Sequence, residues 1–195
     1  MSTIETPDAG PLTVNDWAWL EQPDPGWTRV RMQKDEYSNN FVSGDRSGER
    51  ITVNYFRTAT GDLAAKVIPG PKAQGPPGHA HGGSMMAILD EVMGGCVWLN
   101  GYKVLAAEVT TRLRNVMPLG SHVIGTGHIE RIEGRKVYAS GILRDEDGRV
   151  FAEAEGLFIQ LTPDKLSRIR EHLGYDWQAE FTASEGPGET VILSM

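Results

Sequence analysis

The most apolar stretch of the sequence contains two adjacent carboxylates. Residues 84–99 read SMMAILDEVMGGCVWL, and Asp90 and Glu91 are the only charged residues among them. An unpaired carboxylate is costly to bury, so such a group is either hydrogen-bonded for structure or kept for function. No Lys or Arg lies within the stretch to neutralise Asp90. We therefore predict a catalytic role for Asp90, and we favour a structural or solvent-facing role for Glu91.

The segment HGGS at 81–84 favours chemistry on a carbonyl group. We predict a helix from Gly83 to Leu99, because the run is long and rich in Met, Ala, Ile and Leu. The first N–H groups of a helix lack internal partners and carry the positive end of its dipole. Such a group can stabilise a carbonyl oxygen that gains negative charge, and we predict the Gly83 N–H as this donor. The alternative is that Gly82 and Gly83 only form a tight turn.

Helix geometry sets a condition on these two groups. Asp90 follows Gly83 by seven residues, almost two turns, so both lie on one side of the helix. Seven residues rise about 10 Å, so the two groups of one chain cannot both contact one reacting atom. If they act together, each site takes Gly83 from one subunit and Asp90 from the other, across antiparallel helices of a symmetric dimer.

Other patterns of reactive residues are weaker. HAH at 79–81 suggests part of a metal site, but Met85 and Met86 stand where a carboxylate ligand would follow, and the other histidines lack ligand-like spacing. GPPGHAHGG lacks the Lys-Ser/Thr ending of a phosphate-binding loop. Ser84 is not in a G-x-S-x-G motif and fits better as a residue that starts the helix. We therefore expect neither a metal nor another cofactor.

Length, charge and cysteine content narrow the class of protein. The 195 residues suffice for one domain with extensions, and the net charge of −7 argues against nucleic acid as the main partner. Residues 103–149 nevertheless hold eight Lys or Arg against six Asp or Glu, which suits a small anionic ligand. No apolar stretch reaches the ~20 residues of a membrane span, and no signal peptide is visible. The single cysteine, Cys96, fits a reducing cytoplasm.

Hydrophobic patterns predict the elements that position these residues. A short helix is expected around NDWAWLE, and three nearby Trp residues predict that this arm lies on the domain or on a partner. ERITVNYFR and DLAAKVIP flank TATGD as a hairpin. Four strand signals then follow the central helix, and the short turns PLG, EGR and DEDG predict that they form a meander. DKLSRIREHLG predicts a short amphipathic helix before a weakly patterned tail.

This order of elements predicts an α+β fold. A helix that is apolar on nearly all sides must be covered, so we expect an antiparallel sheet of about six strands wrapped around one long buried helix. We divide the chain into an N-terminal extension at 1–30, the central domain at 31–162, and a C-terminal helix and tail at 163–195. The central domain then contains every residue singled out above.

The motifs together resemble a known family. HGG at 81–83 is followed by Asp90 nine positions after His81, with GPPG before it and MPLG after the next strand. Over about residues 50–161 the sequence resembles hotdog-fold acyl-CoA thioesterases, the group that includes the phenylacetate-pathway and 4-hydroxybenzoyl-CoA thioesterases. The resemblance implies hydrolysis of an acyl-CoA thioester by a homodimer with shared active sites, or by a homotetramer built from two such dimers. Neither nucleic acid nor a membrane is expected as a partner.

The resemblance also implies roles for individual residues. Asp90 would act as general base on water or as nucleophile, the Gly83 N–H would polarise the thioester carbonyl, and His81 would complete the catalytic group. Relatives often place a Ser or Thr early in the next strand, where this chain has Ala106 and Ala107, so Thr110 or Thr111 would have to supply that hydroxyl. The expected substrate-binding residues are Gln74, Gly82, Met86, Thr110, Thr111, Arg112 and Arg114, with Arg131, Arg135 and Lys136 as further candidates for the phosphates.

Two other functions stay open. A non-catalytic hotdog protein that binds acyl-CoA or acyl-carrier protein would fit the absence of the Ser or Thr. A hotdog dehydratase or hydratase would pair a catalytic His with an acid in a different motif, which this sequence does not contain. The sequence leaves the acyl group open.

Overall fold

The computed structural model describes residues 10–32, 40–173, 181–184 and 190–192. Its long central helix and the strands around it follow the hydrophobic pattern of the sequence. In chain order the elements are α1 (Val14–Glu21), β1 (Thr28–Met32), β2 (Ile51–Arg57), β3 (Leu63–Pro69), the short 3₁₀ helix η1 (Pro71–Ala73), α2 (Gly82–Leu99), β4 (Val104–Leu113), β5 (Val123–Glu133), β6 (Lys136–Arg144), β7 (Val150–Gln160), α3 (Pro163–Leu173), β8 (Phe181–Ser184) and β9 (Thr190–Ile192).

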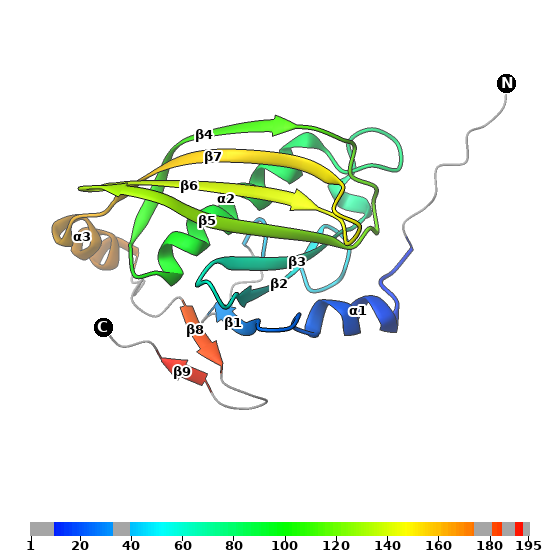
Figure 1. Ribbon diagram of the computed structural model, residues 1–195, viewed down its shortest axis with the longest axis horizontal. Coiled ribbons are helices and arrows are strands. Elements are labelled where there is room, and N and C mark those ends of the chain that lie inside the picture. The colour runs from blue at the N-terminus through cyan, green and yellow to red at the C-terminus, as the bar shows by residue number, and fades with distance from the viewer. Residues whose placement is uncertain (1–9, 33–39, 174–180, 185–189, 193–195) are drawn as a thin grey trace, which may run out of the picture.

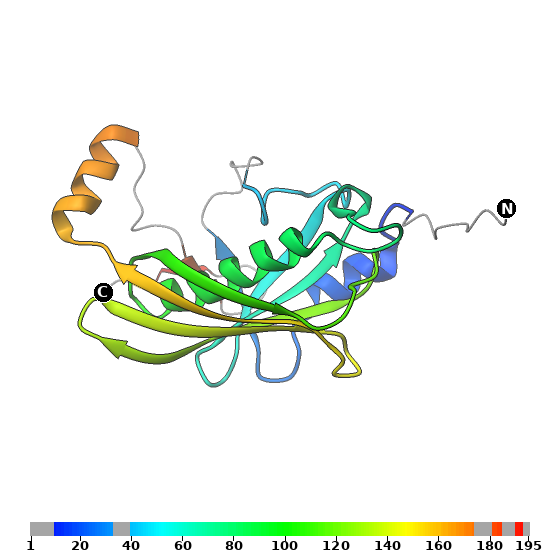
Figure 2. The same ribbon diagram turned by 90° about the horizontal axis from the view of Figure 1, so that it is seen from above.

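The strands form one antiparallel sheet that curves around α2 (Figures 1 and 2). The strand order is β4-β7-β6-β5-β3-β2-β1-β8-β9. Helix α2 packs against β3, β4, β5, β6 and β7 on one face of the sheet, and the main core lies between them. The predicted α+β hotdog architecture is confirmed, and β1, β8 and β9 extend the sheet beyond the six strands expected.

The prediction of a four-stranded meander is wrong for β4. Strands β5, β6 and β7 are successive neighbours, but β4 pairs with β7. The reason lies in the connection after β4, where the Gly120 N–H donates to the Pro69 carbonyl and the Leu119 N–H donates to the Gly78 carbonyl. These bonds lead the chain to β3, with which β5 then pairs, and they leave β4 at an edge of the sheet.

Helix α2 approaches the backbone of β5 very closely. A Cβ atom placed on Gly127 would lie 2.6 Å from the carbonyl carbon of Val92 and 3.0 Å from the amide nitrogen of Met93. Only glycine leaves room for this contact between two backbones. The remaining space between helix and sheet is filled by large buried side chains, among them Ile88, Leu89, Met93, Leu143 and Phe158.

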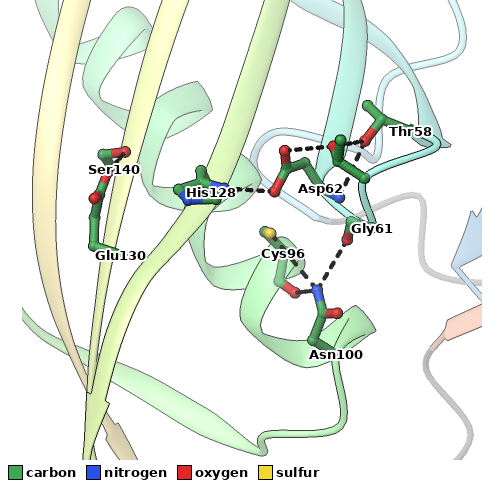
Figure 3. Close-up of polar contacts among 9 residues, drawn as sticks. Thr58, Gly61, Asp62, Cys96, Asn100, His128, Glu130 and Ser140 are labelled. Carbon is green, nitrogen blue, oxygen red and sulfur yellow. Dashed lines mark hydrogen bonds and ion pairs between the residues drawn. The ribbon is translucent and has the colours of Figure 1, made fainter.

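The end of α2 is tied to the hairpin between β2 and β3 (Figure 3). The Asn100 side-chain amide donates to the carbonyl of Gly61 in this hairpin, at 3.0 Å, and to the carbonyl of Cys96, at 2.9 Å. On β5, the Nδ1 atom of His128 lies 2.7 Å from Oδ1 of Asp62 in the same hairpin. The Asn100 bond to Gly61 fixes the end of α2 on this hairpin, and the His128 contact joins the hairpin to β5.

The N-terminal arm packs on the domain, as its tryptophans predict. Leu20 of α1 is fully buried, and the side-chain amide of Asn54 donates to its carbonyl. The ring of Trp27 lies 5.7 Å from that of Phe56. Strand β1 begins inside the predicted extension and pairs with β2, so the arm continues directly into the sheet. The division of the chain at residue 30 stays a prediction.

Helix α3 and two strands form the C-terminal part. Helix α3 projects from the end of β7 (Figure 2). Strand β8 pairs with β1 and β9 with β8, so segments of the predicted tail lengthen the sheet. The division between residues 162 and 163 also stays a prediction. In the described part of the chain, no helix is both long and apolar enough to cross a lipid bilayer.

Candidate active site

His81 and Gly83 lie together at the start of α2. His81 is the N-cap residue in extended conformation, and the Gly83 N–H donates to its Nδ1 atom at 2.9 Å. The preceding loop holds His81 in place, because the His81 N–H donates to the Ala73 carbonyl. Gly75 packs so closely against His81 that a Cβ atom there would lie 2.7 Å from its Cα atom. The turn into the helix is therefore built around the imidazole ring.

This bond occupies the N–H that is predicted to bind a carbonyl oxygen. Because Nδ1 of His81 accepts it, the proton of the neutral ring resides on Nε2. The His81 side chain is exposed at the surface of the single chain. A turn of this exposed ring would therefore free the Gly83 N–H.

Asp90 lies on the face of α2 that the sheet leaves open. It is exposed in the single chain, and Met86, one turn earlier on the same face, is 43% exposed. Within the described residues, the Asp90 carboxylate has no hydrogen-bond or ion-pair partner. Desolvation by the surrounding protein still raises the pKa of this carboxyl above its ordinary value. An accessible, unpaired carboxylate with a raised pKa is suited to take a proton from water.

Glu91 has a different environment from Asp90. The hydroxyl of Tyr55, on β2, donates to its carboxylate at 3.2 Å. Tyr55 is buried, and this burial together with the Glu91 charge raises the pKa of the Tyr55 hydroxyl well above its ordinary value. The contact agrees with the structural role favoured for Glu91, because it ties α2 to the sheet.

Strand β4 runs antiparallel to α2 beside its open face. Leu113, at the end of β4, lies against the start of the helix, since a Cβ atom on Gly82 would be 2.9 Å from its Cδ1 atom. Near the other end of β4, Ala106 pairs with Phe158, whose ring lies against Gly94. Gly94 is four residues beyond the predicted catalytic acid. Ala106 therefore lies level with the helix turn just after Asp90.

Strand alternation separates the two candidate threonines. Thr111 pairs with Ala154, which is buried on the helix side of the sheet. Thr110 pairs with Glu155 and points to the opposite, outer face. Of the two hydroxyls proposed as replacements, Thr111 lies on the same side of the sheet as α2 and Thr110 does not.

The arginines singled out at the end of β4 and just after it also lie on the outer face. Arg112 forms an ion pair with Glu155 at 2.9 Å, and Arg114 forms one with Glu153 at 3.0 Å. These cross-strand pairs lie on the side of the sheet away from α2. The structure therefore does not bring Arg112 and Arg114 together with the predicted catalytic group of the same chain.

The other cationic candidates lie at the hairpin between β5 and β6. Arg131 pairs with Glu133 at 2.8 Å, and the guanidinium of Arg135 donates to the carbonyl of Gln160. Lys136 is exposed at the same end of the sheet. The end of β7 and the start of α3 lie at this end of the sheet (Figure 1). The beginning of α2 lies at the opposite end.

Gln74 and the HAH motif belong to the loop before α2. The Gln74 side-chain oxygen accepts from the Gly78 N–H at 3.2 Å, so this exposed residue braces the loop. His79 directs its Nδ1 atom to the Pro77 carbonyl, at 2.9 Å, while His81 bonds Gly83. No group of three or more His, Cys, Asp or Glu side chains in the described residues is arranged to hold a metal ion.

The sequence did not single out the apolar side chains along β4. Leu113 is 47% exposed and Leu105 is 48% exposed on this edge strand. Leu113 lies two residues after Thr111, so the period-two alternation of VTTRL could have placed it on the helix side. That the strand is an edge could not be read from this pattern.

We expect Asp90→Asn to raise thermal stability at neutral pH. The folded-state pKa of Asp90 is raised above 3.8, so ionisation is less favourable in the folded chain than in the unfolded one. This destabilising effect is present above the folded-state pKa and disappears below the unfolded value, where both states are protonated. The melting temperature of the variant should exceed that of wild type near neutral pH, and the difference should shrink as the pH approaches 3.8. If the difference in melting temperature were the same near neutral pH and near pH 3.8, ionisation of Asp90 would not be what destabilises the wild type.

Comparisons with known proteins find similar sequences over the central part of the chain. The model of the family described as the thioesterase superfamily matches residues 77–152, which include the start of α2 and Asp90. The chain is 43% identical over 111 residues to acyl-coenzyme A thioesterase THEM4 of Xenopus laevis, covering 56% of this chain and 50% of that protein. It is 36% identical over 100 residues to human acyl-coenzyme A thioesterase THEM5, covering 51% and 40%.

A solved structure has a similar fold. The crystal structure of a thioesterase superfamily protein superposes with a TM-score of 0.54 at 33% identity, covering 55% of this chain and 56% of the other. The chain spans about half the length of the curated relatives it matches, or less. The sheet wrapped around α2 and these likenesses lead to one conclusion: the domain has the hotdog fold, and its residues 77–152 match the model of the thioesterase superfamily.

Proposed function

We propose that this chain hydrolyses an acyl-CoA thioester to a free acid and coenzyme A. The observation that carries the proposal is the geometry of α2, which starts with the HGG motif and presents the unpaired Asp90 on its open face two turns later. The names of the relatives, acyl-coenzyme A thioesterases, support coenzyme A as the thiol part of the substrate.

In the proposed reaction, Asp90 accepts a proton from a water molecule whose oxygen attacks the thioester carbonyl carbon. The carbonyl oxygen gains negative charge and accepts a hydrogen bond from the Gly83 N–H. The carbon–sulfur bond then breaks, and the sulfur leaves with the electron pair and takes up a proton. If Asp90 instead attacks the carbon itself, the thiol leaves first and water hydrolyses the resulting mixed anhydride.

His81 has to release the Gly83 N–H for this reaction. Its ring is exposed, so it can turn without displacing core side chains. Without substrate, the Nδ1 atom of His81 accepts the hydrogen bond from the Gly83 N–H. When substrate binds, its carbonyl oxygen takes the place of Nδ1 as the acceptor. This role places His81 in the catalytic group with Gly83 and Asp90.

The two catalytic groups require a second copy of the chain. Along α2 they are separated by about 10 Å, so one chain cannot present both to one carbonyl. The edge strand β4 has unpaired backbone groups and two exposed leucines, Leu105 and Leu113, which favour pairing with β4 of a second copy. A two-fold axis beside β4 would set the two α2 helices antiparallel, with Gly83 of one opposite Asp90 of the other.

This shared site predicts a specific cross-link. If residues 83 and 90 face each other across antiparallel helices, the two-fold axis passes midway between them, beside Met86. A short bismaleimide reagent should therefore cross-link two chains of a Met86→Cys variant in high yield. A Val14→Cys variant, whose site on α1 is 85% exposed, should give no cross-linked dimer. The native Cys96 is fully buried and should not react. Equal yields from both variants on a denaturing gel would contradict the arrangement.

Cys96 is not part of the proposed chemistry. Burial, the largest cause, raises the pKa of its thiol to about 11, so the nucleophilic thiolate is scarce at neutral pH. It lies at the far end of α2, four residues before Asn100 (Figure 3). An unpaired buried thiol supports placing the protein in a reducing cytoplasm, which is part of the proposal.

Release of free thiol from a panel of acyl-CoA thioesters tests the function. The panel should contain short, medium and long aliphatic chains and aromatic acyl groups, and a thiol-reactive dye reports hydrolysis. Turnover of at least one thioester by the dimer supports the proposal. The second candidate, a non-catalytic acyl-CoA binding protein, is favoured by Ala106 beside the helix turn after Asp90. Saturable binding without thiol release from any member of the panel would establish that candidate instead.

A further inference from the structure

Gly94 lies in the interior of α2, where the backbone does not require a glycine. Its φ angle is not among the positive values that some glycines of this chain adopt. Inside a helix, glycine is less favourable than every residue except proline, whereas alanine is the most favourable. An alanine at residue 94 would therefore suit the helix better than the residue that is present.

The packing of the single chain does not require a glycine at residue 94 either. Apart from the backbone of α2 itself, the nearest atom of the described residues to a Cβ atom placed there is Cε1 of Phe158, at 3.4 Å, which is an ordinary van der Waals distance. A Cβ atom on Gly82, at the start of the same helix, would lie only 2.9 Å from Cδ1 of Leu113. Crowding thus explains Gly82 but not Gly94. Glycine is also favoured where a ligand approaches the backbone closely.

Gly94 lies beside the proposed catalytic carboxylate. It follows Asp90 by one helical turn and precedes Trp98 by another, so the three residues share one face of α2. Gly94 is half-buried, and Asp90 is exposed. The rise from Asp90 to Gly94 is about 6 Å. A molecule whose reacting carbon meets Asp90 can therefore cover Gly94 only if it extends several atoms along the helix.

The side chains that flank Gly94 on the side away from the carboxylate are apolar. The Phe158 ring lies against it, and Ala106 on β4, which is exposed, pairs with Phe158. The indole N–H of Trp98 already donates to the carbonyl of Val104 at 3.0 Å. The pantetheine arm of coenzyme A contains amide groups, which are costly to place where they find no hydrogen-bond partners. This surface therefore suits a hydrocarbon chain.

The shared site limits the direction of a long acyl chain. In the proposed dimer, the two sites lie about 10 Å apart along α2, on either side of the axis beside Met86. A chain directed toward the axis has about 5 Å before it meets the chain from the other site. A chain directed away from the axis passes from Asp90 over Gly94 and meets no second substrate.

We propose that the acyl chain of the substrate lies on α2 at Gly94, and that this glycine determines which chain lengths the site accepts. The inference rests on the proposed function, because it takes the position of the thioester from Asp90. A methyl group at residue 94 would occupy part of the space that the chain needs. An acetyl group ends before this point, whereas longer chains have to cross it.

Binding of coenzyme A thioethers to Gly94→Ala tests the inference in the full chain. The series runs from S-ethyl to S-tetradecyl coenzyme A, and titration calorimetry gives each dissociation constant. Gly94→Ala should bind the S-ethyl compound as wild type does. It should bind the S-decyl and S-tetradecyl compounds about tenfold more weakly, the lower end of the discrimination that one methylene group gives in an apolar site. Its melting temperature should nevertheless be about 2 °C higher than that of wild type, because alanine favours the helix.

Gly125→Ala provides the matched control. It adds the same methyl group on β5, where the new Cβ atom meets the side chains of Leu143 and Val92 in the core. This variant should keep the wild-type dependence of affinity on chain length. Equal weakening of all thioethers in Gly94→Ala, loss of its dimer in light scattering, or unchanged binding of the long compounds would overturn the inference.

Thioethers cannot be hydrolysed as thioesters are, so this measurement is independent of turnover. If wild type releases thiol from the acyl-CoA panel but Gly94→Ala binds the long thioethers normally, the proposed function stands and the inference fails. If the binding results are as expected but wild type releases no thiol, the inference stands and the assignment as a hydrolase fails. If wild type binds none of the thioethers, the inference is wrong whatever the thiol assay gives.

Discussion

Asp90→Asn is expected to lower kcat for acyl-CoA hydrolysis by about 10³-fold, which corresponds to about 4 kcal/mol of transition-state stabilisation. The amide keeps the size of the carboxylate but cannot take a proton from water or attack the thioester carbon. KM should change little, because the proposed role of Asp90 is toward the attacking water or the thioester carbon and not toward the coenzyme. Steady-state release of thiol from the best substrate of the panel measures both constants.

Glu91→Gln is the matched control for this loss. It makes the same chemical change on the next residue of α2, and the amide oxygen can still accept from the Tyr55 hydroxyl. We expect kcat within about twofold of wild type and a small loss of thermal stability, because the hydrogen bond no longer involves a charge. If Glu91→Gln lost as much activity as Asp90→Asn, or if Asp90→Asn kept wild-type kcat, the assignment of Asp90 as the catalytic base or nucleophile would be wrong.

Gly127→Ala is expected to destabilise the fold by about 3 kcal/mol, at the upper end of the usual range for overpacking. Replacing glycine by alanine within a regular strand normally stabilises a protein slightly, so the expected sign is reversed here. The reason is the backbone of α2, which a new Cβ atom would approach to 2.6 Å at the Val92 carbonyl carbon. Backbone of a buried helix cannot move aside without disturbing the core. Chemical denaturation measures this free energy of unfolding.

Gly125→Ala, two residues earlier on the same strand, separates backbone from side-chain crowding. Its Cβ atom would meet the ends of two side chains, Leu143 at 3.0 Å and Val92 at 3.4 Å, which can adjust their rotamers. We expect a loss of about 1 kcal/mol or less. Equal losses for the two variants would show that the close contact between α2 and β5 is not what limits residue 127 to glycine.

The local elements of this protein are predictable because their signals are local. The long apolar run gives α2, the alternation around TATGD gives the β2–β3 hairpin, and the short turns EGR and DEDG join β5, β6 and β7. The spacing from Gly83 to Asp90 is likewise a property of the helix, since residues seven apart share one face. These features depend on neighbours within a few residues, and the structure has them.

The position of β4 is not a local property. The PLG turn suggests that β4 and β5 are neighbours, yet hydrogen bonds from Leu119 and Gly120 to distant segments send the chain to β3. This choice leaves β4 at the edge of the sheet beside α2. The register of β4 with β7 places Thr110 and Arg112 on the outer face. A pattern of alternating residues specifies two faces, but it does not say which one meets the helix.

The sequence by itself determined that a carboxylate would stand two helical turns after a glycine-rich helix start, within a sheet-and-helix domain. Only the tertiary structure decided that Asp90 is open and unpaired, that Glu91 bonds Tyr55, and that the Gly83 N–H is held by His81. The physical reason is that periodicity along the chain fixes the direction of a side chain on its own element. The contacts of that side chain depend on elements that are distant in the sequence. Packing and hydrogen bonds between segments bring those elements together, and no single segment determines them.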